Sequence, residues 1–79
     1  MPTILRLFGL VFRIFTRDHL PPHVHVFSSD GEAKFLVDER TVELVDNRGL
    51  KQKDLRLAES ILEENKDLVI KEWTKLHVR

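Results

Sequence analysis

Cysteine is absent from the 79 residues of this chain. Disulfides, iron–sulfur clusters and zinc sites built on thiolates are therefore excluded, and nothing in the composition points to secretion. Net charge is also absent, because 13 Lys and Arg side chains balance 13 Asp and Glu side chains. No field of one sign draws nucleic acid toward the whole molecule, so any such affinity must come from a local patch of charge.

The sequence also lacks a hydrophobic run long enough to cross a membrane. Its most apolar segment, residues 1–15, carries Arg6 and Arg13, is interrupted at Gly9 and has no small-residue cleavage site. We therefore expect neither a signal peptide nor a membrane span, and we expect a cytoplasmic protein. With 42% hydrophobic and 33% charged residues, residues 1–79 predict one small globular domain with a modest core.

Histidine, by contrast, is concentrated in one place. Three of the four histidines fall within residues 18–26, which read DHLPPHVHV. The two prolines fix φ near −65° and favour extended geometry in the residues before them, so they predict a stiff approach that is not helical. After it, Val and His alternate as they do in a half-buried strand, which places His23 and His25 on one face of a sheet and Val24 and Val26 on the other.

Two β-hairpins are predicted in the first half of the chain. Residues 3–15 predict the first, with Phe8 and Gly9 as its turn, Arg6 opposite Val11 and Ile4 opposite Arg13. Phe8 is an unusual residue at a turn position that needs positive φ, so a longer loop is an open alternative.

The second hairpin pairs residues 23–29 with 32–37 through an Asp30-Gly31 turn. In that register Val26 lies opposite Phe35, and His23 lies opposite Asp38. A His–Asp pair of this kind would orient the imidazole and raise its pKa. Residues 41–45 predict a fifth short strand, and the turn-forming residues 46–49 then end the β-rich half.

The second half of the chain predicts helix. Apolar residues at helical spacing form two stripes that fall out of phase across Asn65, which favours two helices over one continuous helix. The stripes are Leu55, Ala58, Ile61 and Leu62, then Val69, Ile70, Trp73 and Leu76. We predict an α+β fold, with a four- to five-stranded antiparallel sheet in residues 1–46 and two C-terminal helices in residues 50–78 packed on one face of it.

The opposite face of the sheet should carry an array of cationic and imidazole side chains. Arg binds phosphate through paired donors and His moves protons near neutral pH, so the array suits RNA cleavage through the 2′-hydroxyl. The predicted catalytic residues are His23, His25, His19, Arg13 and Asp18, and the predicted phosphate-binding residues are Arg6, Arg13, Arg17 and Lys34. The plainer alternative is that these side chains form only the solvated side of a sheet.

A metal site is a further alternative. His23 and His25 on one strand face could share a divalent ion with His19, as in a metal-dependent hydrolase. No specific metal-binding pattern accompanies them, so we predict no cofactor.

Several segments together resemble a small bacterial family, domain of unknown function 4160. They are residues 1–6, 18–26, 30–35, 42–44, 47–49 and 64–65, with Trp73, and they extend over nearly the whole chain. Phe8 departs from the family pattern at a turn where Asp, Asn or Gly is expected. Lys51-Gln52 also departs from it, because it replaces the usual Ser-Pro at a helix start.

The resemblance implies a partner and a role. Members are commonly encoded beside a small protein of family 2442, in what resembles a type II toxin–antitoxin module with this family as the toxin. We therefore expect a cognate antitoxin protein as partner, possible action on RNA, and no membrane partner. The rival interpretation is a non-enzymatic interaction or regulatory module, similar to an antitoxin, that docks through the same sheet face.

Overall fold

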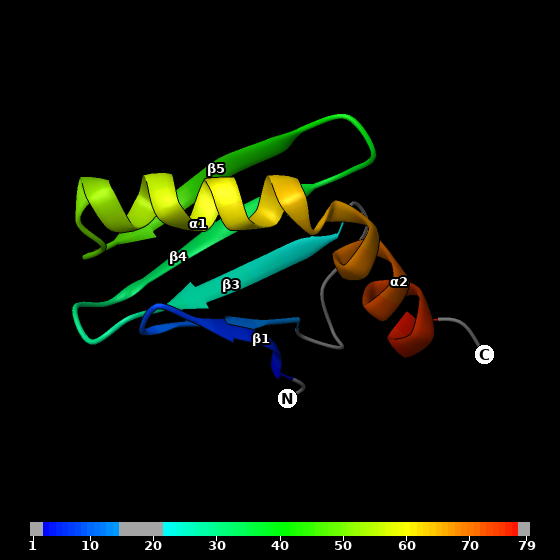
Figure 1. The fold of residues 1–79 in the computed structure, drawn as a ribbon, viewed down its shortest axis with the longest axis horizontal. Helices are drawn as coiled ribbons and strands as arrows, with labels where there is room; N and C mark the ends of the chain where they lie inside the picture. Colours follow the sequence, from blue (N-terminus) through cyan, green and yellow to red (C-terminus); the bar gives the residue numbers. More distant parts are fainter. Residues whose placement is uncertain (1–2, 15–21, 78–79) are drawn as a thin grey trace.

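The computed structural model describes residues 3–14 and 22–77, and these form one sheet and two helices. The five antiparallel strands lie side by side in chain order (Figure 1). The elements are β1 (Thr3–Leu7), β2 (Leu10–Arg13), β3 (His23–Phe27), β4 (Glu32–Val37), β5 (Val42–Arg48), α1 (Gln52–Glu64) and α2 (Lys66–His77). The predicted α+β arrangement of an antiparallel sheet followed by two helices is confirmed.

One face of the sheet is apolar and is covered by α1 (Figure 1). Burial alternates along the inner strands, as the pleat requires. The buried side chains of the sheet include Leu10, Phe12, Val24, Val26, Ala33, Phe35 and Val37, and α1 adds Leu55, Ala58, Ile61 and Leu62 to the same core. Burial of this apolar area is the main stabilising contribution to the fold.

The helical region is broken at Asn65, as the phase change between the two stripes predicts. Asn65 leaves the helical conformation at φ −123° and ψ 24°, and its side-chain amide donates to the Ile61 carbonyl at 2.7 Å. The rival prediction of one continuous helix is therefore wrong. Beyond this break α2 turns away from α1 and lies near the end of the sheet where β3 begins (Figure 1), with Val69 in the core.

The first hairpin has the predicted two-residue turn. Phe8 and Gly9 both adopt positive φ, 53° and 79°, and Arg6 lies opposite Val11. The expected pairing of Ile4 with Arg13 is wrong, because the register shifts between Thr3 and Leu5 and brings Thr3 opposite Arg13.

The second hairpin is paired two residues away from the predicted register. Val26 lies opposite Ala33 rather than Phe35, and His23 lies opposite Leu36 rather than Asp38. The chain reverses earlier than predicted, since the Ser28 amide donates to the Gly31 carbonyl at 2.9 Å. A shift of two residues preserves the face on which every side chain lies, so the predicted division between inner and outer residues still holds.

β5 is longer than predicted and includes Asp46, Asn47 and Arg48, which were expected to form a turn. The reversal comes instead at Gly49, where φ is 106°. The Asn47 side chain spans that bend, accepting from the Leu50 amide at 3.0 Å and donating to its carbonyl at 3.1 Å. The β-rich part of the chain therefore extends past residue 46.

Neither helix in the described part of the chain is both long enough and apolar enough to cross a membrane.

Candidate functional site

The face of the sheet opposite α1 carries the predicted cationic and imidazole residues. Val24 and Val26 are fully buried in the core, so His23 and His25 project from the other side of β3. Arg13 on β2 lies directly opposite His25, and Lys34 on β4 lies opposite it on the other side. The structure therefore brings Arg13, His25 and Lys34 into one row across three strands. Strand alternation predicted that they share a face, but the predicted hairpin register placed Lys34 opposite Phe27 rather than His25.

His25 lies in a shallow polar hollow of about 190 Å³ on this face. It is lined by His25, Glu32, Ala33, Lys34, Asp46 and Arg48, and we call it the sheet-face hollow. The Nδ1 atom of His25 lies 3.8 Å from a carboxylate oxygen of Glu32. That separation is too long for a hydrogen bond, so the Glu32 carboxylate lies beside the imidazole at ion-pair distance.

The strand β5 completes the hollow with one ion pair. The Nε atom of Arg48 donates to an Asp46 carboxylate oxygen at 3.1 Å. Pairing with β4 places Asp46 opposite Lys34 and Arg48 opposite Glu32, because the register shifts at Lys34/Phe35. Charges of both signs thus alternate around His25.

Glu32, Asp46 and Arg48 were not among the residues predicted for the site. Glu32 could have been found, because it precedes Lys34 by two residues and so shares its strand face. Asp46 and Arg48 could not, since the sequence predicts a turn there and only the irregular β4–β5 pairing brings them to His25.

Arg13 packs its guanidinium over an aromatic ring on the neighbouring strand. Its Cζ atom lies 5.4 Å from the centroid of the Phe27 ring, within the range of a cation–π interaction. Its Nε atom is buried and makes no hydrogen bond within the described residues. The guanidinium therefore packs over Phe27, while the backbone of Arg13 lies opposite His25.

His23 has a different environment from His25. Its ring centroid lies 6.5 Å from that of Trp73 on α2, with the ring planes tilted by 49°. The predicted pairing of His23 opposite Asp38 is wrong in register, because His23 lies opposite Leu36. The carboxylate of Asp38 accepts hydrogen bonds from the backbone amides of Arg40 and Thr41 at 2.8 and 2.7 Å. The expectation that both histidines lie away from the helices therefore holds for His25 and is wrong for His23.

The other predicted residues are placed as follows. Arg6 lies on the edge strand β1, and β2 separates it from the strand of His25. Arg17, Asp18 and His19 lie outside the described residues. Within residues 3–14 and 22–77, no three His, Asp or Glu side chains are grouped closely enough to hold a metal ion.

A second, more apolar hollow lies between α2 and the loop that joins β4 to β5. It measures about 400 Å³ and is lined by Pro22, Asp38, Glu39, Arg40, Ile70, Trp73 and Thr74. We call it the end cleft. Nothing in the sequence pattern pointed to it, because its two walls are separated by some thirty residues of chain.

Comparison with known proteins adds the family and nothing further. A family model described as Domain of unknown function (DUF4160) matches residues 9–74. Searches of curated proteins and of solved structures found no match. Since the family model covers most of the chain, including all of the sheet-face hollow, the protein belongs to this family of unknown function.

Proposed function

We propose that this protein cleaves RNA at the sheet-face hollow and acts as the toxin of a cytoplasmic toxin–antitoxin pair. The observation that carries the proposal is the position of His25. It lies 3.8 Å from Glu32 in a hollow that also holds Lys34 and Arg48, and Arg13 lies opposite it on the next strand. These are groups that phosphodiester chemistry can use, namely a base, a carboxylate beside it and cations for the phosphate.

In the proposed reaction the ribose 2′-oxygen attacks the adjacent phosphorus while His25 takes the 2′-hydroxyl proton. Glu32 stabilises the imidazolium that results, and Lys34, Arg48 and Arg13 stabilise the negative charge on the phosphoryl oxygens. The bond from phosphorus to the 5′-oxygen breaks as that oxygen receives a proton, for which we propose His23 as donor. The products are a 2′,3′-cyclic phosphate and a free 5′-hydroxyl.

The spacing of the two imidazoles supports this division of roles. His23 and His25 project from the same strand face two residues apart, which separates their backbones by about 6.6 Å. A phosphate between them would meet one imidazole on the side of the attacking oxygen and the other on the side of the leaving oxygen. Arg17, Asp18 and His19 remain proposed contributors from the adjoining segment.

The toxin role rests on the family resemblance and has a direct test. Expression of the chain alone should arrest bacterial growth, and co-expression of the neighbouring family 2442-like protein should restore it. Normal growth with soluble protein present would remove the basis of the toxin proposal. The same experiment identifies the antitoxin partner.

The chemistry has a separate test. Purified protein should cleave RNA to products ending in a 2′,3′-cyclic phosphate, and His25→Ala should lower the rate by about 10²–10⁴-fold. Glu32→Gln should lower it less, because it removes only the carboxylate beside the imidazole. Glu59→Gln, on an exposed position of α1, is the matched control and should leave the rate unchanged.

An interaction module is the second candidate, and exposed apolar side chains favour it. Leu7, Phe8, Leu44 and Val45 are all more than a third exposed, as is common on surfaces that bind other proteins. Under this proposal His25→Ala would weaken partner binding, and no RNA cleavage would be detected with either the wild type or the variant. Cleavage that depends on His25 would decide against it.

A further inference from the structure

The tip of the first hairpin presents a large apolar side chain to solvent at a conformational cost. Phe8 adopts a positive φ of 53° and is 77% exposed, and Leu7 beside it is 38% exposed. Positive φ is unfavourable for bulky side chains, and Asn or Gly would form the same turn with less strain. Strain of this kind is typically kept where a residue takes part in function.

The end cleft is a preformed receptor for an apolar side chain. Its apolar lining residues are Pro22, Ile70 and Trp73, and its volume of about 400 Å³ exceeds that of an aromatic side chain. Trp73 is only 3% exposed, so this part of the lining is fixed by packing within the fold.

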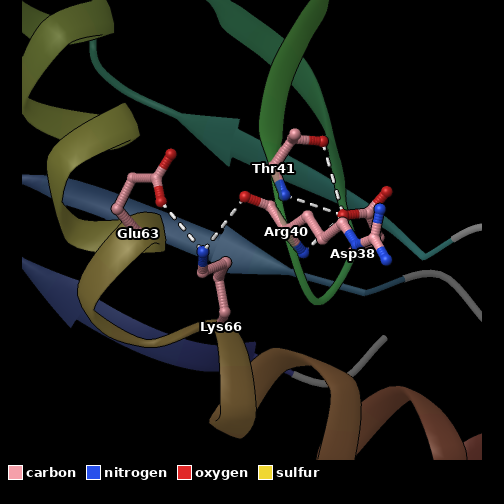
Figure 2. A network of polar contacts seen from close by, with 5 residues as sticks. All are labelled: Asp38, Arg40, Thr41, Glu63 and Lys66. Carbon is pink, nitrogen blue, oxygen red and sulfur yellow. Dashed lines mark hydrogen bonds and ion pairs between the residues drawn. The ribbon is translucent and has the colours of Figure 1, made fainter.

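The loop wall of the end cleft is held in place from two sides, as Figure 2 shows. Asp38 accepts from the amides of Arg40 and Thr41 and so fixes the loop internally. Lys66 at the start of α2 donates to the Arg40 carbonyl at 3.4 Å and pairs with Glu63 at 3.2 Å. An incoming side chain therefore meets a cleft that needs little rearrangement, which lowers the entropic cost of binding.

The charges near the hairpin tip and around the end cleft are complementary. Near the hairpin tip, Arg6 is exposed two residues before Phe8. The end cleft is lined by two carboxylates, Asp38 and Glu39, and by one guanidinium, Arg40. Carboxylates at the rim disfavour a phosphate and favour an apolar group accompanied by a cation. The hairpin tip is such a group.

We propose that Phe8 of one copy of this protein inserts into the end cleft of a second copy. The turn between β1 and β2 lies at the opposite end of the molecule from α2 and the β4–β5 loop (Figure 1), which line the end cleft, so one chain does not fill its own cleft. The contact is head-to-tail and can repeat from copy to copy. Because a single anchor side chain buries less area than a standard interface, the association is reversible and concentration-dependent.

The single tryptophan of the sequence lies in the cleft and reports on its occupation. The indole N–H resonance of Trp73 should shift with protein concentration between about 10 μM and about 1 mM. At the high end of this range the average mass should rise above the 9.3 kDa of one chain. Phe8→Asn should abolish both effects while making the turn less strained. Thr74→Arg, which places a bulky cation at an exposed position lining the cleft, should abolish them too.

Mixing the two variants gives the decisive measurement. Phe8→Asn retains the cleft and Thr74→Arg retains the tip, so each alone should be monomeric and the mixture should form a dimer that grows no further. Only the Trp73 resonance of the Phe8→Asn copy should shift. Val45→Thr and Ser60→Arg, on β5 and α1, are matched controls that should associate like the wild type.

Three results would overturn the proposal. They are a wild-type chain that stays monomeric up to about 1 mM, a mixture that does not dimerise, and association that survives Phe8→Asn but is lost in Val45→Thr. The last result would place the contact at the β5 edge. Far-UV circular dichroism of each variant ensures that a loss of association is not a loss of fold.

Discussion

At the scale of single residues, Asp38 shows how one side chain organises a loop. One of its carboxylate oxygens accepts from the amides of Thr41 and Arg40 and lies 3.4 Å from the Thr41 hydroxyl (Figure 2). Two hydrogen bonds lower the pKa of Asp38 below its ordinary value of 3.8. The one from the Thr41 amide has the larger effect and the one from the Arg40 amide the next largest. The loop wall of the end cleft therefore depends on this carboxylate being ionised.

This shift predicts a specific pH dependence of stability. Because the pKa of Asp38 is lower in the folded chain, its contribution is fully present above about pH 3.8 and is lost as the pH falls through the lowered folded value. Asp38→Ala should therefore reduce the free energy of unfolding at pH 7, and the difference from wild type should shrink toward pH 2. Urea unfolding at a series of pH values measures this.

Glu59→Ala, on an exposed position of α1, is the control for that series and should show no such convergence. If the difference between Asp38→Ala and wild type stays constant down to pH 2, the hydrogen bonds of the ionised carboxylate do not stabilise the fold.

At the scale of elements, the close approach of the β3–β4 loop to the end of β5 shapes the sheet-face hollow. A Cβ atom at Gly31 would overlap the Arg48 carbonyl oxygen, and one at Gly49 would lie 2.5 Å from the Asp30 carbonyl oxygen. Gly31 is thus needed for space rather than for positive φ. The two glycines let β5 run beside β4 as far as Arg48.

Gly31→Ala should accordingly destabilise the protein although the backbone conformation of Gly31 is ordinary. We expect the free energy of unfolding to fall by about 1–3 kcal/mol, as for other overpacked sites. Ser29→Ala, in the same loop but exposed, should change it by no more than about 0.5 kcal/mol. Urea denaturation measures the free energy of unfolding of both variants. If Gly31→Ala is as stable as Ser29→Ala, the β3–β4 loop can move away from the end of β5 without loss of stability.

The edge strands also bear on self-association. The pairing of β1 with β2 is irregular near Ile4, and that of β4 with β5 is irregular near Val45. Irregular edge strands discourage the addition of further strands. Association through the hairpin tip and the end cleft is therefore favoured over edge-to-edge pairing.

At the scale of the whole molecule, the sheet and both helices share one hydrophobic core. Val69 of α2 belongs to the cluster that includes Leu62 of α1 and Phe35 of β4. A domain with one core of this size is expected to unfold in a single step.

We therefore predict coincident unfolding transitions. Fluorescence of Trp73, which reports on α2, and far-UV circular dichroism, which reports on the whole chain, should give the same midpoint in urea. An earlier transition by fluorescence would mean that α2 detaches first and that the end cleft opens independently of the sheet. Measurement at about 5 μM avoids a contribution from self-association.

The sequence by itself determined the elements and the faces on which their side chains lie. Alternation of Val and His in β3 placed Val24 and Val26 inward and His25 outward, and this survived a two-residue error in the hairpin register because side chains in a strand repeat every two residues. The phase change at Asn65 likewise separated the helices, since helical periodicity is a local property.

Only the tertiary structure decided which side chains meet. The irregular β4–β5 pairing brought Asp46 and Arg48 to His25, and the direction of α2 brought Trp73 to His23 and created the end cleft. These contacts join residues far apart in the chain, so they depend on strand register and on helix direction. Both are settled by packing of the whole core, which local sequence patterns do not encode.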